Sequence, residues 1–171
     1  LHLCDQNLER IESDKINSAH NLLVDVLLSA KHEGQSIINN YRQLGHNSSS
    51  SVCTALARSF ADIGDIVRGK DLFLGHKQKK NELEASFKKM FQNIQCNNIK
   101  LQTLTLHQVR EYWWAFNRQE VWKAITCEAE VEDKYSKTMN NGKLIFWNYR
   151  CGNFVNQDVP TNLDYVPQYL R

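Results

Sequence analysis

Apolar residues recur three or four positions apart along most of the chain, which is the spacing of one face of an α-helix. The first stripe, Ile16–Tyr41, predicts one helix of about 27 residues, although Gly34 weakens it locally. The second stripe, Val52–Val67, predicts another helix, and Gly69 follows it where a left-handed C-terminal cap is expected. A third stripe predicts a helix over about Lys77–Gln95.

Two capping motifs mark helix starts further along the chain. Thr105 is followed three residues later by Gln108, and Asn117 in the same way by Glu120. Each pair matches the capping box, in which the two side chains bond each other's backbone N–H groups at a helix start. The motifs therefore predict two abutting helices, the first with the apolar residues Val109, Tyr112, Trp113 and Phe116 and the second with Val121, Trp122 and Ile125.

The remaining segments carry loop and turn signals. Gln43–Ser51 is small and polar, and the glycosylation acceptor pattern at Asn47 is read mainly as loop evidence, because so short a motif often arises by chance. Lys134–Asp158 is polar and irregular apart from Lys143–Tyr149, which fits either a short strand or a strapped loop. A last helix is expected to start near Pro167, because proline is tolerated in a first turn.

Composition and charge narrow the class of protein. The chain has 171 residues, 42% of them hydrophobic, so it can form one domain with a core, and its 7 glycines and 2 prolines favour an all-α fold. The 21 Lys and Arg nearly balance the 19 Asp and Glu, so the total charge does not indicate a nucleic-acid partner. No apolar run reaches the roughly 18 residues of a membrane span.

The chain has five cysteines, at positions 4, 53, 96, 127 and 151. They form no CxxC pair, which argues against zinc and thioredoxin-like sites. Two disulfides with one cysteine left over is the simplest oxidised arrangement. Five free thiols, as in an intracellular protein, is the alternative that composition leaves open.

Two acids lie inside the second apolar stripe. Asp62 and Asp65 share a helical face with Arg58 and Arg68, at spacings of four and three. Metal-assisted hydrolysis needs further carboxylates or histidines at matching spacing, and the sequence has no such motif. We therefore expect these carboxylates to pair, partly buried, with arginines of this helix or of one packed against it.

The aromatic residues of Tyr112–Trp122 fit either a core or a surface on which bases or sugars stack. Their helical spacing favours the core, with Trp114 off the main stripe. The residues expected to be buried are Phe60, Ile63, Trp113, Phe116 and Trp122.

Lysines cluster along the third stripe. Between Lys70 and Met90 six lysines stand against three acids, and several of them can share a solvent-facing side of the helix. Such a side is a candidate surface for sulfated or phosphorylated polymers, while an ordinary solvated face is the alternative. The candidate glycan-binding residues are Lys77, Lys79, Lys80, Lys88 and Lys89.

Several long blocks carry a specific resemblance. RSFADIGDIVRGKDLFLG, VREYWWAFNRQEVWKAITC and DYVPQYLR resemble the hallmark blocks of Duffy-binding-like domains, alpha class, of the Plasmodium falciparum erythrocyte membrane protein one family; LHLCDQNLE and SAKHEGQSI fit the same pattern. The resemblance implies a helical-bundle subdomain with long polar loops, without catalysis, cofactor or metal. It also implies that residues 1–171 are a single fragment, the end of a first subdomain plus the second, with the N-terminal segment and the third subdomain absent.

By the same resemblance, the chain is expected on the surface of the infected red cell, in the extracellular part of a membrane-anchored protein. Its expected partners are host cell-surface glycans or glycoproteins and other domains of the same protein, with no nucleic acid. Heparan sulfate-like chains and blood-group sugars are the glycans linked to rosetting, the clustering of uninfected red cells. A scaffold with no ligand site of its own is the alternative.

The resemblance also implies a disulfide scheme, taken from more distant erythrocyte-binding relatives. The implied pairs are Cys53 with Cys151 and Cys96 with Cys127, with Cys4 bonded to a residue upstream of Leu1. Relatives commonly have a cysteine near the position of Leu27, where this sequence departs from the family pattern.

Overall fold

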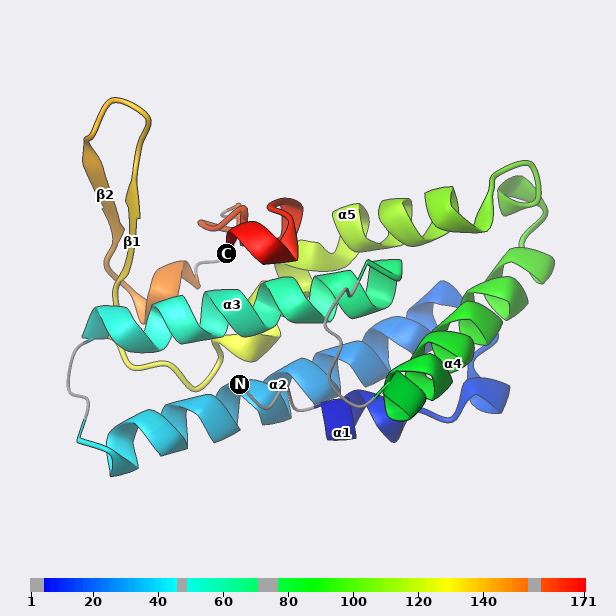
Figure 1. Ribbon diagram of the computed structural model, residues 1–171, viewed down its shortest axis with the longest axis horizontal. Coiled ribbons are helices and arrows are strands. Elements are labelled where there is room, and N and C mark those ends of the chain that lie inside the picture. The colour runs from blue at the N-terminus through cyan, green and yellow to red at the C-terminus, as the bar shows by residue number, and fades with distance from the viewer. Residues whose placement is uncertain (1–4, 46–48, 71–76, 154–157) are drawn as a thin grey trace.

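The structure, a computed structural model, describes residues 5–45, 49–70, 77–153 and 158–171. Helices dominate, as the sequence predicts: α2, α3 and α5 run along the long axis of the molecule, and α4 runs obliquely near one end (Figure 1). The main elements are α1 (Asp5–Glu9), α2 (Ala19–Gln43), α3 (Ser49–Arg68), α4 (Lys77–Cys96), α5 (Leu106–Ile125), β1 (Tyr135–Thr138) and β2 (Leu144–Trp147). Short 3-10 turns are η1 (Ser13–Lys15), η2 (Ile99–Leu101), η3 (Arg150–Gly152), η4 (Leu163–Tyr165) and η5 (Gln168–Leu170).

Helix α2 is the long helix that the first apolar stripe predicts, with 25 residues. It begins at Ala19 because the Ser18 side chain caps it, accepting a hydrogen bond from the backbone N–H of Asn21 at 3.2 Å. Gly34 lies on its buried side, where a Cβ atom would stand 2.0 Å from the carbonyl oxygen of Ile125 at the end of α5. The glycine that weakens the helix is therefore the residue that lets α2 and α5 come together.

Helices α3 and α4 follow their apolar stripes. Gly69 ends α3 with a φ of 73°, and its N–H bonds the carbonyl of Ile66 at 3.2 Å, which is the left-handed cap expected there. Helix α4 packs against α5 and η1. The residues that α4 buries are Leu83, Phe87, Met90, Phe91 and Ile94.

Helix α5 is one continuous helix, so the prediction of two abutting helices is wrong. Thr105 does cap its start: the Thr105 hydroxyl accepts from the Gln108 N–H at 3.2 Å, and the Gln108 side chain accepts from the Thr105 N–H at 2.9 Å. Asn117, in contrast, is buried in the middle of the helix and donates to the carbonyl of Trp113, one turn back, at 2.8 Å. An asparagine whose amide is satisfied within the helix does not interrupt it.

The core lies where α5 packs against α2, α3 and α4. Four of the five residues predicted to be buried are buried, but Phe116 is 88% exposed, whereas Trp114 is fully buried. The residues Tyr112–Phe116 are apolar without interruption, so periodicity alone could not decide which side of the helix faces inward.

The C-terminal third contains the only sheet in the part of the chain that the structure describes. Strands β1 and β2 pair antiparallel, with Tyr135 opposite Trp147, so Lys143–Tyr149 contains the short strand rather than a strapped loop. The hairpin projects from one end of the helical body (Figure 1). Only the three-residue turn η5 follows Pro167, so the predicted last helix is wrong. The acceptor pattern at Asn47 lies outside the described residues.

One disulfide fastens the base of this hairpin to α3. Cys53 and Cys151 are bonded, as the resemblance implies, across a sequence separation of 98. Cys96 and Cys127 are free thiols, so their expected pairing is wrong. Cys96 ends α4 just before the start of α5, and Cys127 follows the end of α5, so a helix of about 30 Å separates them. Cys4 lies outside the described residues.

Candidate functional site

The two acids of α3 belong to a buried ionic cluster. Asp65 pairs with Arg68 on the same helix at 3.3 Å, and both side chains are almost fully buried. Arg171 reaches back to both acids, 3.1 Å from Asp62 and 2.8 Å from Asp65. Arg58, the other expected partner, is exposed. The second arginine therefore comes from the C-terminal segment rather than from a helix, but the acids hold the fold as the sequence analysis expects.

Asp164 of η4 extends this cluster towards α5. Its fully buried carboxylate accepts hydrogen bonds from Arg118 at 2.7 and 2.8 Å and from the indole N–H of Trp114 at 2.8 Å. The Arg118 guanidinium also lies 4.9 Å from the ring centre of Tyr165, whose hydroxyl pKa is raised by burial. The cluster thus fastens the C-terminal segment onto α3 and α5.

The charged groups of this cluster are engaged with one another. Each of its carboxylates, those of Asp62, Asp65 and Asp164, lies within ion-pair distance of a guanidinium. Within the described residues, no group of three or more His, Cys, Asp or Glu side chains could hold a metal ion. The cluster is therefore a structural feature that holds the fold together.

The candidate lysines on α4 do not share one face. Successive residues of a helix are about 100° apart, so Lys79 and Lys80 diverge, as do Lys88 and Lys89. Lys79 and Lys88 are exposed, and Lys80 is half-buried. Lys89 instead pairs with Asp14 of η1, where α4 meets the N-terminal segment. Lys77 begins α4, and its side chain lies outside the described residues.

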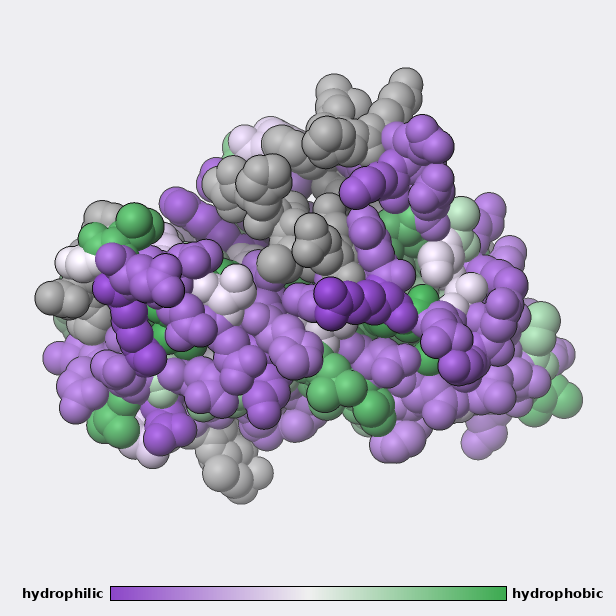
Figure 2. Space-filling view, turned by 90° about the horizontal axis from the view of Figure 1, so that it is seen from below, coloured by the Kyte–Doolittle hydropathy of each residue, from purple (hydrophilic) through white to green (hydrophobic). Residues whose placement is uncertain are grey.

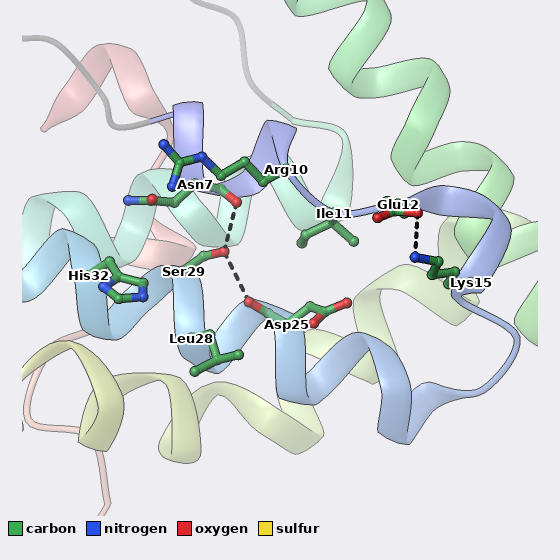
Figure 3. A pocket seen from close by; sticks show the side chains of 9 residues that line it. All are labelled: Asn7, Arg10, Ile11, Glu12, Lys15, Asp25, Leu28, Ser29 and His32. Atoms are coloured by element: carbon green, nitrogen blue, oxygen red, sulfur yellow. Dashed lines mark hydrogen bonds and ion pairs between the residues drawn. The ribbon is translucent and has the colours of Figure 1, made fainter.

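A groove of about 310 Å³, here called the N-terminal groove, lies between α2 and the segment that precedes it (Figure 3). Its α2 wall consists of four residues spaced three or four apart, Asp25, Leu28, Ser29 and His32. Its other wall comes from α1, η1 and the chain between them, with Asn7, Arg10, Ile11, Glu12 and Lys15.

One serine joins the two walls of the N-terminal groove. The buried Ser29 hydroxyl lies 3.1 Å from the carbonyl oxygen of Asn7 and 3.0 Å from that of Asp25, donating to both (Figure 3). At the far end, Lys15 and Glu12 form an ion pair at 2.7 Å. The hydroxyl fixes the N-terminal segment against α2, so the groove has a defined width.

A third surface is the outer side of α5. Tyr112 and Phe116 lie one turn apart and are 61% and 88% exposed. Besides this aromatic ridge, other large apolar side chains of the described residues are also exposed, such as Ile99 and Tyr169, and on the underside of the molecule apolar residues lie in small separate patches on a mainly hydrophilic surface (Figure 2). Among the described helices, none combines the length and apolar character needed to cross a membrane.

Sequence reasoning missed the N-terminal groove and half of the ionic cluster. Arg10 belongs to no motif, and His32 lies in the block SAKHEGQSI without a role that the sequence assigns to it; only the spacing of the four α2 residues hints that they share a side of the helix. The residues Arg118, Asp164 and Arg171 lie within blocks that supported the family resemblance, but nothing in their spacing indicates that they meet Asp62 and Asp65 in space.

Comparison with known proteins confirms the predicted family. The family model described as Duffy binding domain matches residues 1–171. The chain is similar to the NTS-DBL1(alpha-1) domain of the Plasmodium falciparum membrane protein 1 (PfEMP1) from the varO strain, with 39% identity and a TM-score of 0.87, covering 99% of this chain and 40% of that one.

A second solved structure is more distant. The ICAM-1-binding PfEMP1 IT4var13 DBLbeta domain is 31% identical, with a TM-score of 0.71, and the match covers 99% of this chain and 39% of that one. The chain thus spans about 40% of the length of these solved relatives. No curated protein matches the chain.

Proposed function

The chain belongs to the Duffy binding domain family, and we propose that it is a non-catalytic adhesion module that binds a receptor on host cells. The observation that carries the proposal is its match, over its whole length, to domains of PfEMP1. One such domain, at 30% identity, was solved bound to ICAM-1. Because this chain spans about 40% of that structure, binding by the chain itself has to be tested directly.

The proposal places the chain outside the cell, in a parasite surface protein on the infected red cell, beside further domains. Two observations support this. The Cys53–Cys151 disulfide fits an oxidising environment. A similar solved structure, 39% identical, is a double domain in which NTS-DBL1-alpha is followed by CIDR-gamma.

For the ligand, the proposal favours a sulfated glycan of the heparan sulfate type, held on the exposed part of α4. Lys79 and Lys88 extend into solvent there, and Lys80 of the same helix is half-buried. Exposed ammonium groups attract a polyanion mainly by long-range electrostatics and by release of its counterions. Blood-group sugars without charge gain little from such a surface, so they are the weaker candidates for this site.

The test is heparin binding by the 171-residue chain at several salt concentrations. The double variant Lys79→Glu/Lys88→Glu should bind heparin more weakly. Its affinity should also depend less steeply on salt, because fewer counterions are released when fewer lysines contact the polymer. The matched control, Lys134→Glu/Lys143→Glu, makes the same charge change at two exposed positions. Lys134 directly precedes β1, and Lys143 lies in the loop between β1 and β2. Equal losses in both variants would show that only net charge matters and would remove α4 as the site. Circular dichroism should show unchanged helicity in both.

The aromatic ridge on α5 favours a second candidate function, a scaffold that presents other parts of a longer domain. About 60% of the length of the solved relative lies outside the matched region, and that remainder is the occupant that the ridge fits. Tyr112→Ala/Phe116→Ala should then destabilise a longer chain that includes this remainder but leave the 171-residue chain unchanged. Equal effects in the two proteins would contradict the scaffold proposal.

A further inference from the structure

The N-terminal groove carries polar side chains that bond no residue in the described part of the chain. Arg10 and His32 lie at one end of it, near the side chain of Asn7 (Figure 3). Neither has a hydrogen bond or ion pair with any residue that the structure describes, although most other arginines in that part of the chain have one. This end therefore offers unused donors at the edge of a folded wall.

The middle of the groove is apolar, and its other side carries a hydrogen-bond acceptor. Leu28 is 51% exposed and forms the floor beside the nearly buried Ile11. The carboxylate of Asp25, one turn from Leu28 on α2, likewise bonds no residue within the described ranges. Seven of the nine lining residues are polar and two are apolar, so the groove suits a polar ligand that has one apolar face.

The charge pattern selects among ligands. The closely spaced sulfate groups of heparin would meet the Asp25 carboxylate as well as Arg10 and would be partly repelled, whereas the Glu12 carboxylate is already paired with Lys15. A ligand with one negative charge and several hydroxyl groups fits both ends, because its hydroxyls can donate to the Asp25 carboxylate. The volume of about 310 Å³ is at the small end of ligand pockets, which suits a single sugar ring and its substituents.

We propose that the N-terminal groove binds one carboxylated sugar unit of a host cell-surface glycan. Arg10 holds the sugar carboxylate, with His32 and the Asn7 amide as neighbouring donors. Asp25 accepts hydrogen bonds from ring hydroxyls, and Leu28 contacts the C–H face of the ring. The inference rests on the proposed adhesive function for the source of the ligand, but its residues are separate from the α4 lysines.

Two glycan sources share this chemistry, uronic acids and sialic acids, and two probes separate them. Methyl β-D-glucuronide and the methyl glycoside of N-acetylneuraminic acid are titrated into the isotope-labelled 171-residue chain, and amide shifts are followed by NMR. Either carboxylated probe should shift the amides of 7–15 and 25–32, and the tighter one identifies the source. Methyl β-D-glucoside, which lacks the carboxylate, should bind at least ten-fold more weakly.

Variants test the assigned contacts. Arg10→Gln should weaken binding of the carboxylated probe about ten-fold, as expected for loss of a charge-assisted hydrogen bond, while the exposed Arg58→Gln, the matched control on α3, should change it less than two-fold. Asp25→Asn should weaken binding about three-fold or more if Asp25 accepts hydroxyls. Strengthened binding in Asp25→Asn would reveal a simple anion site and overturn the proposal.

Three further results would also overturn it: equal binding of the glucoside, shifts confined to residues outside the groove, or tighter binding of an acidic tripeptide than of either sugar. Heparin binding measured on Arg10→Gln keeps the two proposals apart. If Arg10→Gln loses sugar binding but keeps its heparin affinity, the groove proposal is supported. If both Arg10→Gln and Lys79→Glu/Lys88→Glu lose heparin binding, the groove is part of one polyanion-binding surface and the groove proposal is overturned.

Discussion

Substitution of Gly34 by alanine should destabilise the protein, although alanine is the better helix former. In an exposed helix the change gains about 1 kcal/mol of helix propensity. Here the new methyl group would stand 2.0 Å from the carbonyl oxygen of Ile125, whereas ordinary contacts begin at 3.4 Å. The atom it meets is backbone, so α2 and α5 must separate by about 1.4 Å, and neither can yield by rotating a side chain.

The size of the effect follows from these opposing contributions. Overpacking a core costs about 1 to 3 kcal/mol, occasionally more, and a backbone clash between two helices belongs at the upper end. After the propensity gain of about 1 kcal/mol, the net loss should be about 2 kcal/mol, or about 4 to 8 °C in melting temperature for a chain of this size.

Urea unfolding followed by circular dichroism measures this loss, with the disulfide intact in every sample. Asn39→Ala is the matched control, because it is an exposed position on the same helix and should change stability only through helix propensity, by a few tenths of a kcal/mol in the stabilising direction. A Gly34→Ala protein as stable as the parent, or more stable, would refute the reasoning that Gly34 is required for the approach of α2 to α5.

Two further predictions concern the core and the cysteines. Trp113→Ala should lower the free energy of unfolding by about 3 to 5 kcal/mol because Trp113 is buried, whereas Phe116→Ala should change it by less than about 0.5 kcal/mol. Similar melting temperatures for the two variants would contradict the assignment of Trp113 to the buried side of α5 and of Phe116 to the exposed side. Removing the disulfide by Cys53→Ala should cost about 4.7 kcal/mol in the loop-entropy model, because the bond joins residues with a sequence separation of 98. In the native oxidised chain, a thiol reagent should label the exposed Cys96 quickly and Cys127 slowly. Burial and then the Glu128 carboxylate raise the pKa of the Cys127 thiol, and the thiolate is the reactive form, so labelling of Cys127 should accelerate as pH rises. Equal labelling rates of the two cysteines at neutral pH would count against this.

Elements with a single clear signal were predicted well from the sequence. The stripes of α2, α3 and α4 each have one apolar side, so the side that faces the core follows from the spacing of three and four. The caps at Thr105 and Gly69 were also correct, because a cap depends on bonds within a few residues. The error at Asn117 arose because asparagine followed by glutamate three residues later fits the interior of a helix as well as its start, and here the Asn117 amide donates to the carbonyl of Trp113 one turn back.

The candidate sites show the same division. The lysines are visible in the sequence as a local excess of charge, but Lys89 pairs with Asp14, which is 75 residues away, and no local pattern carries that information. The N-terminal groove was missed because its two walls are held together by Ser29 and the Asn7 carbonyl, a contact between segments 22 residues apart.

The sequence by itself therefore determined the all-α class, the family and most helix boundaries, because these depend on interactions between residues close together in the chain or on long blocks of matching sequence. Tertiary structure alone decided which side of α5 is buried, which acids meet Arg171, and that Arg10 and His32 line a groove with Asp25. Each of these depends on how the helices dock. Docking is set by the sum of many packing contacts, such as the approach of Gly34 to Ile125, and no short segment encodes that sum.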